Sequence, residues 1–241
     1  STEPETFAYY KKMKEKHPSF HVVTWKEGFN YSAINNFGAS FAKGEYLLLL
    51  NNDTELLEPD SIREMLGFCQ REEVGIAGAR LLYADDTIQH AGVVVGLGGV
   101  AAHVLCKLPR DAEGYMGRLR CVQEISAVTA ACMMVKTSVF KAVGGFDEEL
   151  KVAFNDIDLC MKVRKYGVKI VFTPYAELYH YESKSRGMED TPEKQLRFSR
   201  EVNCFRRKWE RELLKGDPYY NPNLTLNNTD CSLRKQEKNG D

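Results

Sequence analysis

The sequence lacks three features that would assign it to a special class of protein. It has no apolar run approaching the roughly 20 residues of a membrane-spanning helix. Its charges nearly cancel, with 33 Lys and Arg against 34 Asp and Glu, and its seven cysteines are scattered and include no CxxC pair. We therefore expect no transmembrane segment, no net field that would attract nucleic acid or an anionic membrane, and reduced thiols in the cytoplasm rather than disulfides or a zinc site.

What the sequence does contain, in its first third, is an alternation of helical and strand patterns. Apolar residues recur at helical spacing in residues 5–16 and 32–42, and each of these segments precedes a β-rich run, residues 20–25 and 47–50. The four leucines of the second run predict a strand that is buried on both faces. Such alternation predicts an α/β fold, with a mostly parallel sheet and helices on both of its faces.

The middle of the chain carries a glycine pattern with two interpretations. Gly96, Gly98 and Ala101 match the dinucleotide-binding fingerprint, which would indicate a nicotinamide oxidoreductase. That fingerprint requires a sizeable helix directly after it, and Pro109 cuts the segment short. The turn of a β-hairpin is therefore the better interpretation.

The patterns that follow predict a strand, a helix and a second strand. Residues 125–135 form an apolar run, and residues 152–167 predict a helix that has Asn155 as its N-cap and ends before Gly167. The next strand is expected over residues 169–173, where Pro174 interrupts the β-rich pattern.

Beyond this region the composition becomes strongly charged. Residues 194–214 mix Lys and Arg with aromatic residues, a combination that can indicate nucleic-acid binding. Acidic residues interrupt the basic ones here, so a helix with a solvated face, lying on the main domain, is the better interpretation. We expect a main domain over residues 1–187, and a helical appendage with a disordered tail over residues 188–241.

Three polar residues stand where chemistry is expected. Asp53 directly follows the strand of residues 47–50, at the edge where α/β sheets bind ligands, and a carboxylate there suits Mg²⁺ or Mn²⁺. Asp156 lies in the first turn of a helix, whose dipole favours an ionised carboxylate that can act as a base. His180 follows a strand. Each residue also has an ordinary interpretation. Asp53 could be a turn residue, Asp156 an acidic residue at the start of a helix with no catalytic role, and His180 a surface or core histidine.

Three motifs, in this order, resemble those of family 2 glycosyltransferases of the GT-A fold, especially the bacterial rhamnosyltransferase-like branch. They are FNYSAINNFGASFAKGEYLLLLNNDTEL, GGFDEEL with FNDIDLCMKVRKYG, and HYESKSRG. The resemblance extends to about Leu224. It implies an inverting enzyme that moves a sugar from a nucleotide-diphosphate donor to an acceptor hydroxyl.

The resemblance also implies a role for particular residues. Asp53, His180 and Asn51 would bind Mn²⁺ or Mg²⁺, and Asp156 would be the catalytic base. Further residues would contact the substrates: Asn36, Asn52, Asp158, Ser183, Ser185 and Arg186.

Two departures from the family pattern both remove a charge. The acidic metal-binding motif is Asn51-Asn52-Asp53 here, and the acidic pair before the base-bearing helix is Asn155-Asp156. A non-catalytic module that binds sugar nucleotides, or acts as a scaffold in a larger protein, is therefore the alternative function.

By the same resemblance, the acceptor is a glycan or a lipid-linked molecule of cell-surface polysaccharide synthesis. We expect the protein itself in the cytoplasm, or bound peripherally at the inner face of the membrane. The family has two strands before the point where this sequence starts, and its sheet order places them between residues 20–25 and 47–50. We therefore expect a truncated sheet with an open edge, which a second copy or a preceding domain would complete.

Overall fold

The computed structural model describes residues 3–182 and 191–235. Its helices are α1 (Pro4–Lys16), α2 (Tyr31–Phe41), α3 (Ser61–Cys69), α4 (Thr137–Ala142), α5 (Asn155–Tyr166), α6 (Pro192–Lys208) and α7 (Glu210–Lys215), with short 3-10 turns η1 (Leu97–Gly99) and η2 (Tyr115–Gly117). Its strands are β1 (Tyr46–Leu50), β2 (Thr54–Leu56), β3 (Val74–Leu82), β4 (Ile88–His90), β5 (Val93–Val95), β6 (Ala101–His103), β7 (Gln123–Glu124), β8 (Cys132–Lys136) and β9 (Lys169–His180).

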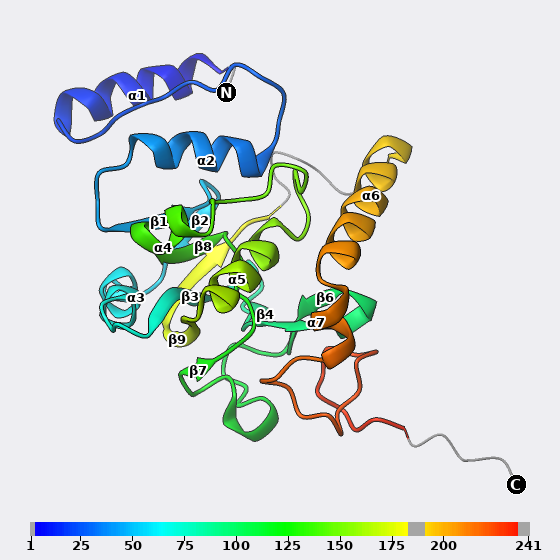
Figure 1. The fold of residues 1–241 in the computed structure, drawn as a ribbon. Coiled ribbons are helices and arrows are strands. Elements are labelled where there is room, and N and C mark those ends of the chain that lie inside the picture. Colours follow the sequence, from blue (N-terminus) through cyan, green and yellow to red (C-terminus); the bar gives the residue numbers. More distant parts are fainter. Residues whose placement is uncertain (1–2, 183–190, 236–241) are drawn as a thin grey trace, which may run out of the picture.

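The main sheet has the strand order β1-β8-β3-β9-β2, with β4 beside β3 and β7 beside β9 (Figure 1). The α/β class and the mixed sheet are confirmed, but within the described residues only β3 and β9 run parallel. The expected excess of parallel pairs depended on a strand at residues 20–25, which form none. A strand needs a neighbour for its hydrogen bonds. Here Trp25 packs against Phe37 instead, with 5.5 Å between ring centroids.

The leucines of β1 are buried unevenly. Leu47 and Leu49 are each 7% exposed and belong to the main core, whereas Leu50 is 45% exposed. The prediction of a strand buried on both faces is confirmed only in part: Leu48 packs against the second apolar cluster but is only half-buried, because β1 lies at the edge of the sheet. Among the strands that the structure describes, it pairs only with β8.

Helices cover both faces of the sheet, as expected. Met65 of α3 packs in an apolar cluster with Leu81 on one face of β3, and Leu159 of α5 packs in the main cluster with Ile76 on the other. Gly78 in β3 lets Val128 lie directly against the strand, because a Cβ at position 78 would lie only 2.4 Å from Cγ1 of Val128. The loop of residues 127–131 can therefore pack directly on the centre of the sheet.

Strand β9 is longer than the sequence suggests. It continues past Pro174 to His180, because an irregularity in its pairing with β3 accommodates the proline: Ala79 pairs with Thr173, and the next residue of β3, Arg80, pairs with Glu177. The extension carries His180 to the end of the sheet where Asp53 lies.

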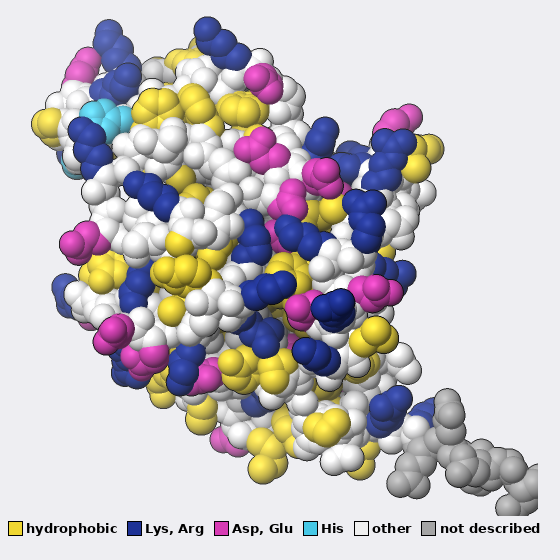
Figure 2. Space-filling view, in the orientation of Figure 1, with side chains coloured by type: hydrophobic (Ala, Val, Ile, Leu, Met, Phe, Trp, Pro, Cys, Tyr) yellow, Lys and Arg dark blue, Asp and Glu magenta, His cyan; other side chains and the backbone are white. Residues whose placement is uncertain are grey.

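The C-terminal helices share a core with the rest of the molecule. Strands β5 and β6 form the expected antiparallel hairpin, and Phe205 and Trp209 are buried in the same apolar cluster as β5. Basic side chains line the exposed side of α6, and apolar ones gather over α2 (Figure 2). Of the helices described, none is long and apolar enough to cross a bilayer.

Candidate functional site

Strand pairing brings Asp53 and His180 together. Asp53 lies between β1 and β2, and β2 pairs with the end of β9 so that Thr54 stands opposite His180. The backbone N–H of Tyr181 donates to the carbonyl oxygen of Asp53 at 2.8 Å. As a result, Nε2 of His180 lies 3.3 Å from Oδ1 of Asp53. The pairing predicted from the family motifs is therefore present in the geometry.

The imidazole of His180 has a partner on each side. Its Nδ1 lies 2.7 Å from Oε1 of Gln89, and its Nε2 lies 3.2 Å from Nδ2 of Asn51. Burial lowers the pKa of His180 below its ordinary value, although the negative charge of Asp53 acts in the opposite direction. The ring is therefore mainly neutral at pH 7, which is the form that binds metal ions.

The residues present fit a divalent cation. Oδ1 of Asp53 is buried and accepts no hydrogen bond from the described residues, and an unpaired buried carboxylate oxygen is unfavourable. A cation bound between Asp53 and His180 would satisfy it. The described part of the chain holds no cluster of three or more His, Cys, Asp or Glu residues that could bind a metal, so Asp53 and His180 would supply only some of the ligands that such a cation requires. Asn51 turns its amide nitrogen toward the ring, and coordination by its oxygen would require the amide to rotate.

A cleft of about 400 Å³ opens beside these residues. Its walls come from the segment of residues 50–53, from the N-terminal half of α2 and from the end of β9. Asn52 is exposed and lines this cleft. Asp53 and His180 thus lie in a concave site that is open to a ligand.

Asp156 lies in the first turn of α5, as predicted, and is half-buried. Its Oδ2 accepts a hydrogen bond from the backbone N–H of Ala130 at 3.2 Å, and its Oδ1 accepts one from Ile157 at 2.9 Å. Each oxygen keeps a further lone pair that can accept a proton. The hydroxyl of Tyr31 donates to the carbonyl of Ala130 at 3.0 Å, and burial, reinforced by Asp156, raises the pKa of Tyr31, so that it remains a neutral donor.

The N-cap of α5 differs from the prediction. The cap position is Phe154, in a left-handed conformation with φ of 63°, and Asn155 is the first helical residue. Oδ1 of Asn155 accepts from the N–H of Asp156 at 2.7 Å, and its amide donates to the carbonyl of Val152 at 3.1 Å. Asn155 therefore fixes the turn before the helix instead of capping it.

The loop of residues 127–131 connects the two sides of the site. The sequence predicts one continuous strand over residues 125–135, but β8 begins only at Cys132. The carbonyl of Ala131 accepts from the N–H of Asn51 at 2.9 Å, and the N–H of Thr129 donates to Nε2 of His90 at 3.3 Å. One short loop thus contacts Asn51 on the metal side and, through Ala130, the proposed base.

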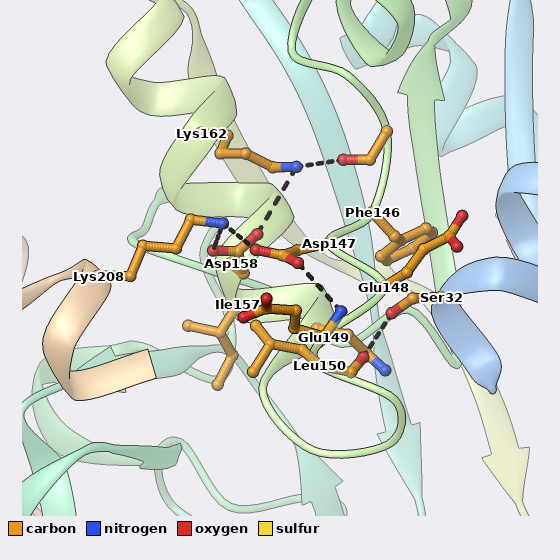
Figure 3. Close-up of polar contacts among 12 residues, drawn as sticks. Ser32, Phe146, Asp147, Glu148, Glu149, Leu150, Ile157, Asp158, Lys162 and Lys208 are labelled. Carbon is orange, nitrogen blue, oxygen red and sulfur yellow. Dashed lines mark hydrogen bonds and ion pairs between the residues drawn. The ribbon is translucent and has the colours of Figure 1, made fainter. Parts of the chain in front are cut away.

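Two of the predicted substrate-binding residues hold the protein together instead of lining the cleft. Asn36 pairs with the backbone of Phe146, accepting from its N–H at 2.8 Å and donating to its carbonyl at 3.0 Å. Asp158 is fully buried and accepts from Nε1 of Trp209 at 2.8 Å. Lys208 bridges Asp158 and Asp147, as Figure 3 shows. Ser183, Ser185 and Arg186 lie outside the described residues.

Two residues behind the site carry no local sequence signal. Gln89 holds His180, as described above, and Glu201 of α6 is 2% exposed. The carboxylate of Glu201 accepts from the backbone N–H groups of Val152 and Ala153, at 2.9 and 3.1 Å. These contacts join segments 91 and 49 residues apart, so no local pattern could have found them.

Comparison with known proteins matches the chain to one family. The model of a family described as "Glycosyltransferase like family 2" matches residues 3–200. An uncharacterised protein of Sinorhizobium fredii is 49% identical over 234 residues, which are 97% of this chain and 26% of that protein. The O-antigen biosynthesis protein RfbC of Myxococcus xanthus is 40% identical over 242 residues, which are 100% of this chain and 18% of that protein. The chain thus spans about a quarter or less of these relatives.

Solved structures share its architecture. A mannosyltransferase of Pyrobaculum calidifontis in complex with GDP-Man and Mn²⁺ superimposes with a TM-score of 0.59 and 15% identity, covering 88% of this chain and 53% of that one. GalNAc-T7 with UDP, GalNAc and Mn²⁺ gives a TM-score of 0.66 with 14% identity, covering 89% and 42%. At this level of identity the likeness concerns the fold.

Proposed function

The chain belongs to glycosyltransferase family 2 and has the GT-A fold, and on that basis we propose that it transfers a sugar from a nucleotide-diphosphate donor to an acceptor hydroxyl with inversion. The observation that carries the proposal is the unpaired Oδ1 of Asp53, which lies buried opposite His180 beside a cleft. Such a site suits the cation that accompanies a diphosphate. The Mn²⁺ in the two related structures supports this assignment.

On the donor side, Asp53 and His180 would hold Mn²⁺ or Mg²⁺, and Asn51 would join them if its amide rotated. When bound, such an ion offsets the charge that develops on the departing nucleoside diphosphate. Asn52, exposed at the cleft, is placed to contact the donor. Ser183, Ser185 and Arg186 keep the donor-binding roles that the family resemblance implies.

On the acceptor side, Asp156 accepts the proton of the attacking hydroxyl. Its two backbone hydrogen bonds fix the direction of the carboxylate, and positioned bases of this kind contribute about 10²–10⁴-fold to a rate. Asn36 and Asp158 act indirectly in this account, since they hold the segment of residues 145–150 and helix α5. The relative named for O-antigen biosynthesis supports a glycan or lipid-linked acceptor of cell-surface polysaccharide synthesis. The protein would act on it in the cytoplasm or at the inner face of the membrane, as the family resemblance implies.

A non-catalytic module that binds sugar nucleotides is the second candidate. It is favoured by one observation: both oxygens of Asp156 already accept backbone hydrogen bonds, which leaves fewer lone pairs for the hydroxyl of an acceptor.

A panel of nucleotide sugars separates the two functions. UDP-, GDP- and dTDP-linked sugars are first screened with Mn²⁺ for a rise in melting temperature, and the stabilising donors are then assayed for sugar release to water or to added glycan acceptors. We expect stabilisation together with turnover. Stabilisation without any turnover would favour the binding module, and neither effect with any donor would contradict both.

A further inference from the structure

Gln89, in β4, makes a two-point contact with His180. Its Oε1 lies 2.7 Å from Nδ1 of the ring, and its Nε2 donates to the backbone carbonyl oxygen of the same histidine at 3.0 Å. The side chain is almost fully buried, at 3% exposed. Both contacts come from one rigid amide, so the position of the imidazole is tied to that of the backbone carbonyl of the same residue.

The orientation of this amide determines where the imidazole proton sits. A backbone carbonyl can only accept, so the NH₂ group of Gln89 must face the carbonyl of His180. Oε1 then faces Nδ1, and since an amide oxygen also only accepts, Nδ1 must carry the hydrogen. A neutral imidazole has a single N–H, so Nε2 keeps its lone pair. That lone pair faces Asn51 and Asp53.

We propose that Gln89 is a positioning residue that fixes the Nδ1–H tautomer of His180 and thereby aims the Nε2 lone pair at the cation site beside Asp53. The use of that lone pair rests on the proposed function, whereas the tautomer itself does not. Histidines that bind metals usually donate their second N–H to such a partner, and loss of the partner typically weakens metal binding 10–100-fold.

Gln89 is itself held in place. Its backbone carbonyl accepts from Nδ1 of His103 at 3.0 Å and from Sγ of Cys106 at 3.2 Å. A glutamate in this position could still accept from Nδ1 of His180. Its second oxygen, however, would face the carbonyl of His180, and two acceptors repel one another. An amide is the group that satisfies both atoms of His180.

The tautomer can be measured directly by NMR on the metal-free protein. Long-range ¹H–¹⁵N correlation of histidine-labelled protein, at about pH 8 where an ordinary imidazole is neutral, should show His180 protonated on Nδ1. In Gln89→Met, a substitution of similar size, that preference should be lost. The affinity for Mn²⁺ in the presence of UDP, measured from the electron paramagnetic resonance signal of free Mn²⁺, should fall on the order of 10-fold or more.

Two further variants make the test decisive. Gln89→Glu should keep the Nδ1–H tautomer and lower the Mn²⁺ affinity less, so it remains informative if Gln89→Met does not fold. Gln123→Met is the matched control, because the amide of Gln123 donates to the backbone carbonyls of Arg118 and Cys121 and not to His180. It should change neither quantity.

Three results would overturn the inference: an Nε2–H tautomer in the wild-type protein, a Gln89→Met variant that keeps either the tautomer or the wild-type Mn²⁺ affinity, or loss of the tautomer in Gln89→Glu. A wild-type protein with the Nδ1–H tautomer, lost in Gln89→Met, but with no affinity for Mn²⁺, would instead support the positioning role and overturn the metal site of the proposed function.

Discussion

The two sides of the site are built in different ways. On the metal side, regular strand pairing sets the positions of Asp53 and His180, since both lie at strand ends whose register fixes them. On the base side, Asp156 depends on irregular backbone: the loop of residues 127–131 in front of it and the left-handed Phe154 before it. A position set by register is determined by the whole ladder of hydrogen bonds, whereas a position set by loops depends on a few contacts.

The base side compensates with contacts from the C-terminal helix. Glu201 accepts from the backbone just before Phe154, and the ring of Phe154 packs 5.4 Å from that of Phe205. Lys208, at the end of α6, bridges Asp147 and Asp158 on the far side of α5 (Figure 3). Helix α6 is therefore part of the support for the proposed catalytic base. Because the two sides are built independently, substitutions on the metal side should impair metal and donor binding, and substitutions on the base side should impair turnover.

The largest expected effect is on turnover, from Asp156→Asn. Asparagine keeps the size of the side chain but cannot take the acceptor's proton, so kcat should fall about 10²–10⁴-fold while donor affinity stays near the wild-type value. Steady-state kinetics and nucleotide titration measure the two quantities. Asp60→Asn, at an exposed carboxylate before α3, is the control. Equal losses of kcat and donor affinity would show that Asp156 is structural.

His180→Ala should produce the complementary defect. It removes one neutral ligand and leaves the charge of Asp53. We therefore expect the Mn²⁺-dependent gain in UDP affinity to shrink by at least the roughly 10–100-fold that loss of a partner behind a ligand costs, and UDP binding without metal to persist. Calorimetric titration with and without Mn²⁺ measures this. If metal dependence remained complete in the variant, His180 would not be a ligand.

Glu201→Gln tests whether α6 supports the base. One of the two backbone N–H groups would keep an uncharged amide oxygen as acceptor, and the other would lose its acceptor and face an NH₂ group. Asp156 should then be held less precisely, and kcat should fall by about a factor of ten, equivalent to about 1.4 kcal/mol. The KM for the donor should not change, and Glu210→Gln on the exposed start of α7 should leave both parameters intact. A change in donor KM with kcat unaffected would refute this division of roles.

The last expected effect is on stability instead of turnover or binding, and it is a pH dependence that belongs to the metal side. Burial lowers the pKa of His90, helped by His103 and His180, and burial lowers that of His180. Below about pH 6.5 the unfolded chain therefore binds protons that the native state excludes, and the free energy of unfolding should decrease by up to about 1.4 kcal/mol per histidine per pH unit. Urea unfolding at pH 7.5 and 5.5 should show a smaller decrease for His90→Gln than for the wild type. Identical decreases would contradict the buried neutral state of His90.

The same division explains how much could be predicted from the sequence. The positions of Asp53 and Asp156 could be predicted from local patterns. Asp53 comes just after the leucine run of β1, and Asp156 lies in the first turn of α5, whose helical pattern is clear. The segment of residues 20–25 was misassigned because β propensity says nothing about whether a neighbouring strand exists. The prediction of a continuous strand over residues 125–135 missed the loop that joins the two sides, since small apolar residues suit a strand and a buried loop equally well.

Gln89 and Glu201 were not predictable for a different reason. Their partners lie far along the chain, and neither residue belongs to a local motif with a known physical meaning. Their roles follow from burial and from hydrogen-bond partners that only the folded chain brings together.

The most direct test of the account is the effect of Asp53→Ala on nucleotide binding with and without Mn²⁺. In the wild type, Mn²⁺ should increase the affinity for UDP or for the preferred nucleotide found in the donor screen. In Asp53→Ala, which removes the only charged ligand we assign, the increase should vanish while the protein keeps its fold by circular dichroism. An undiminished Mn²⁺-dependent increase in the folded variant would contradict the assignment of Asp53 and His180 as the metal-binding side of the site.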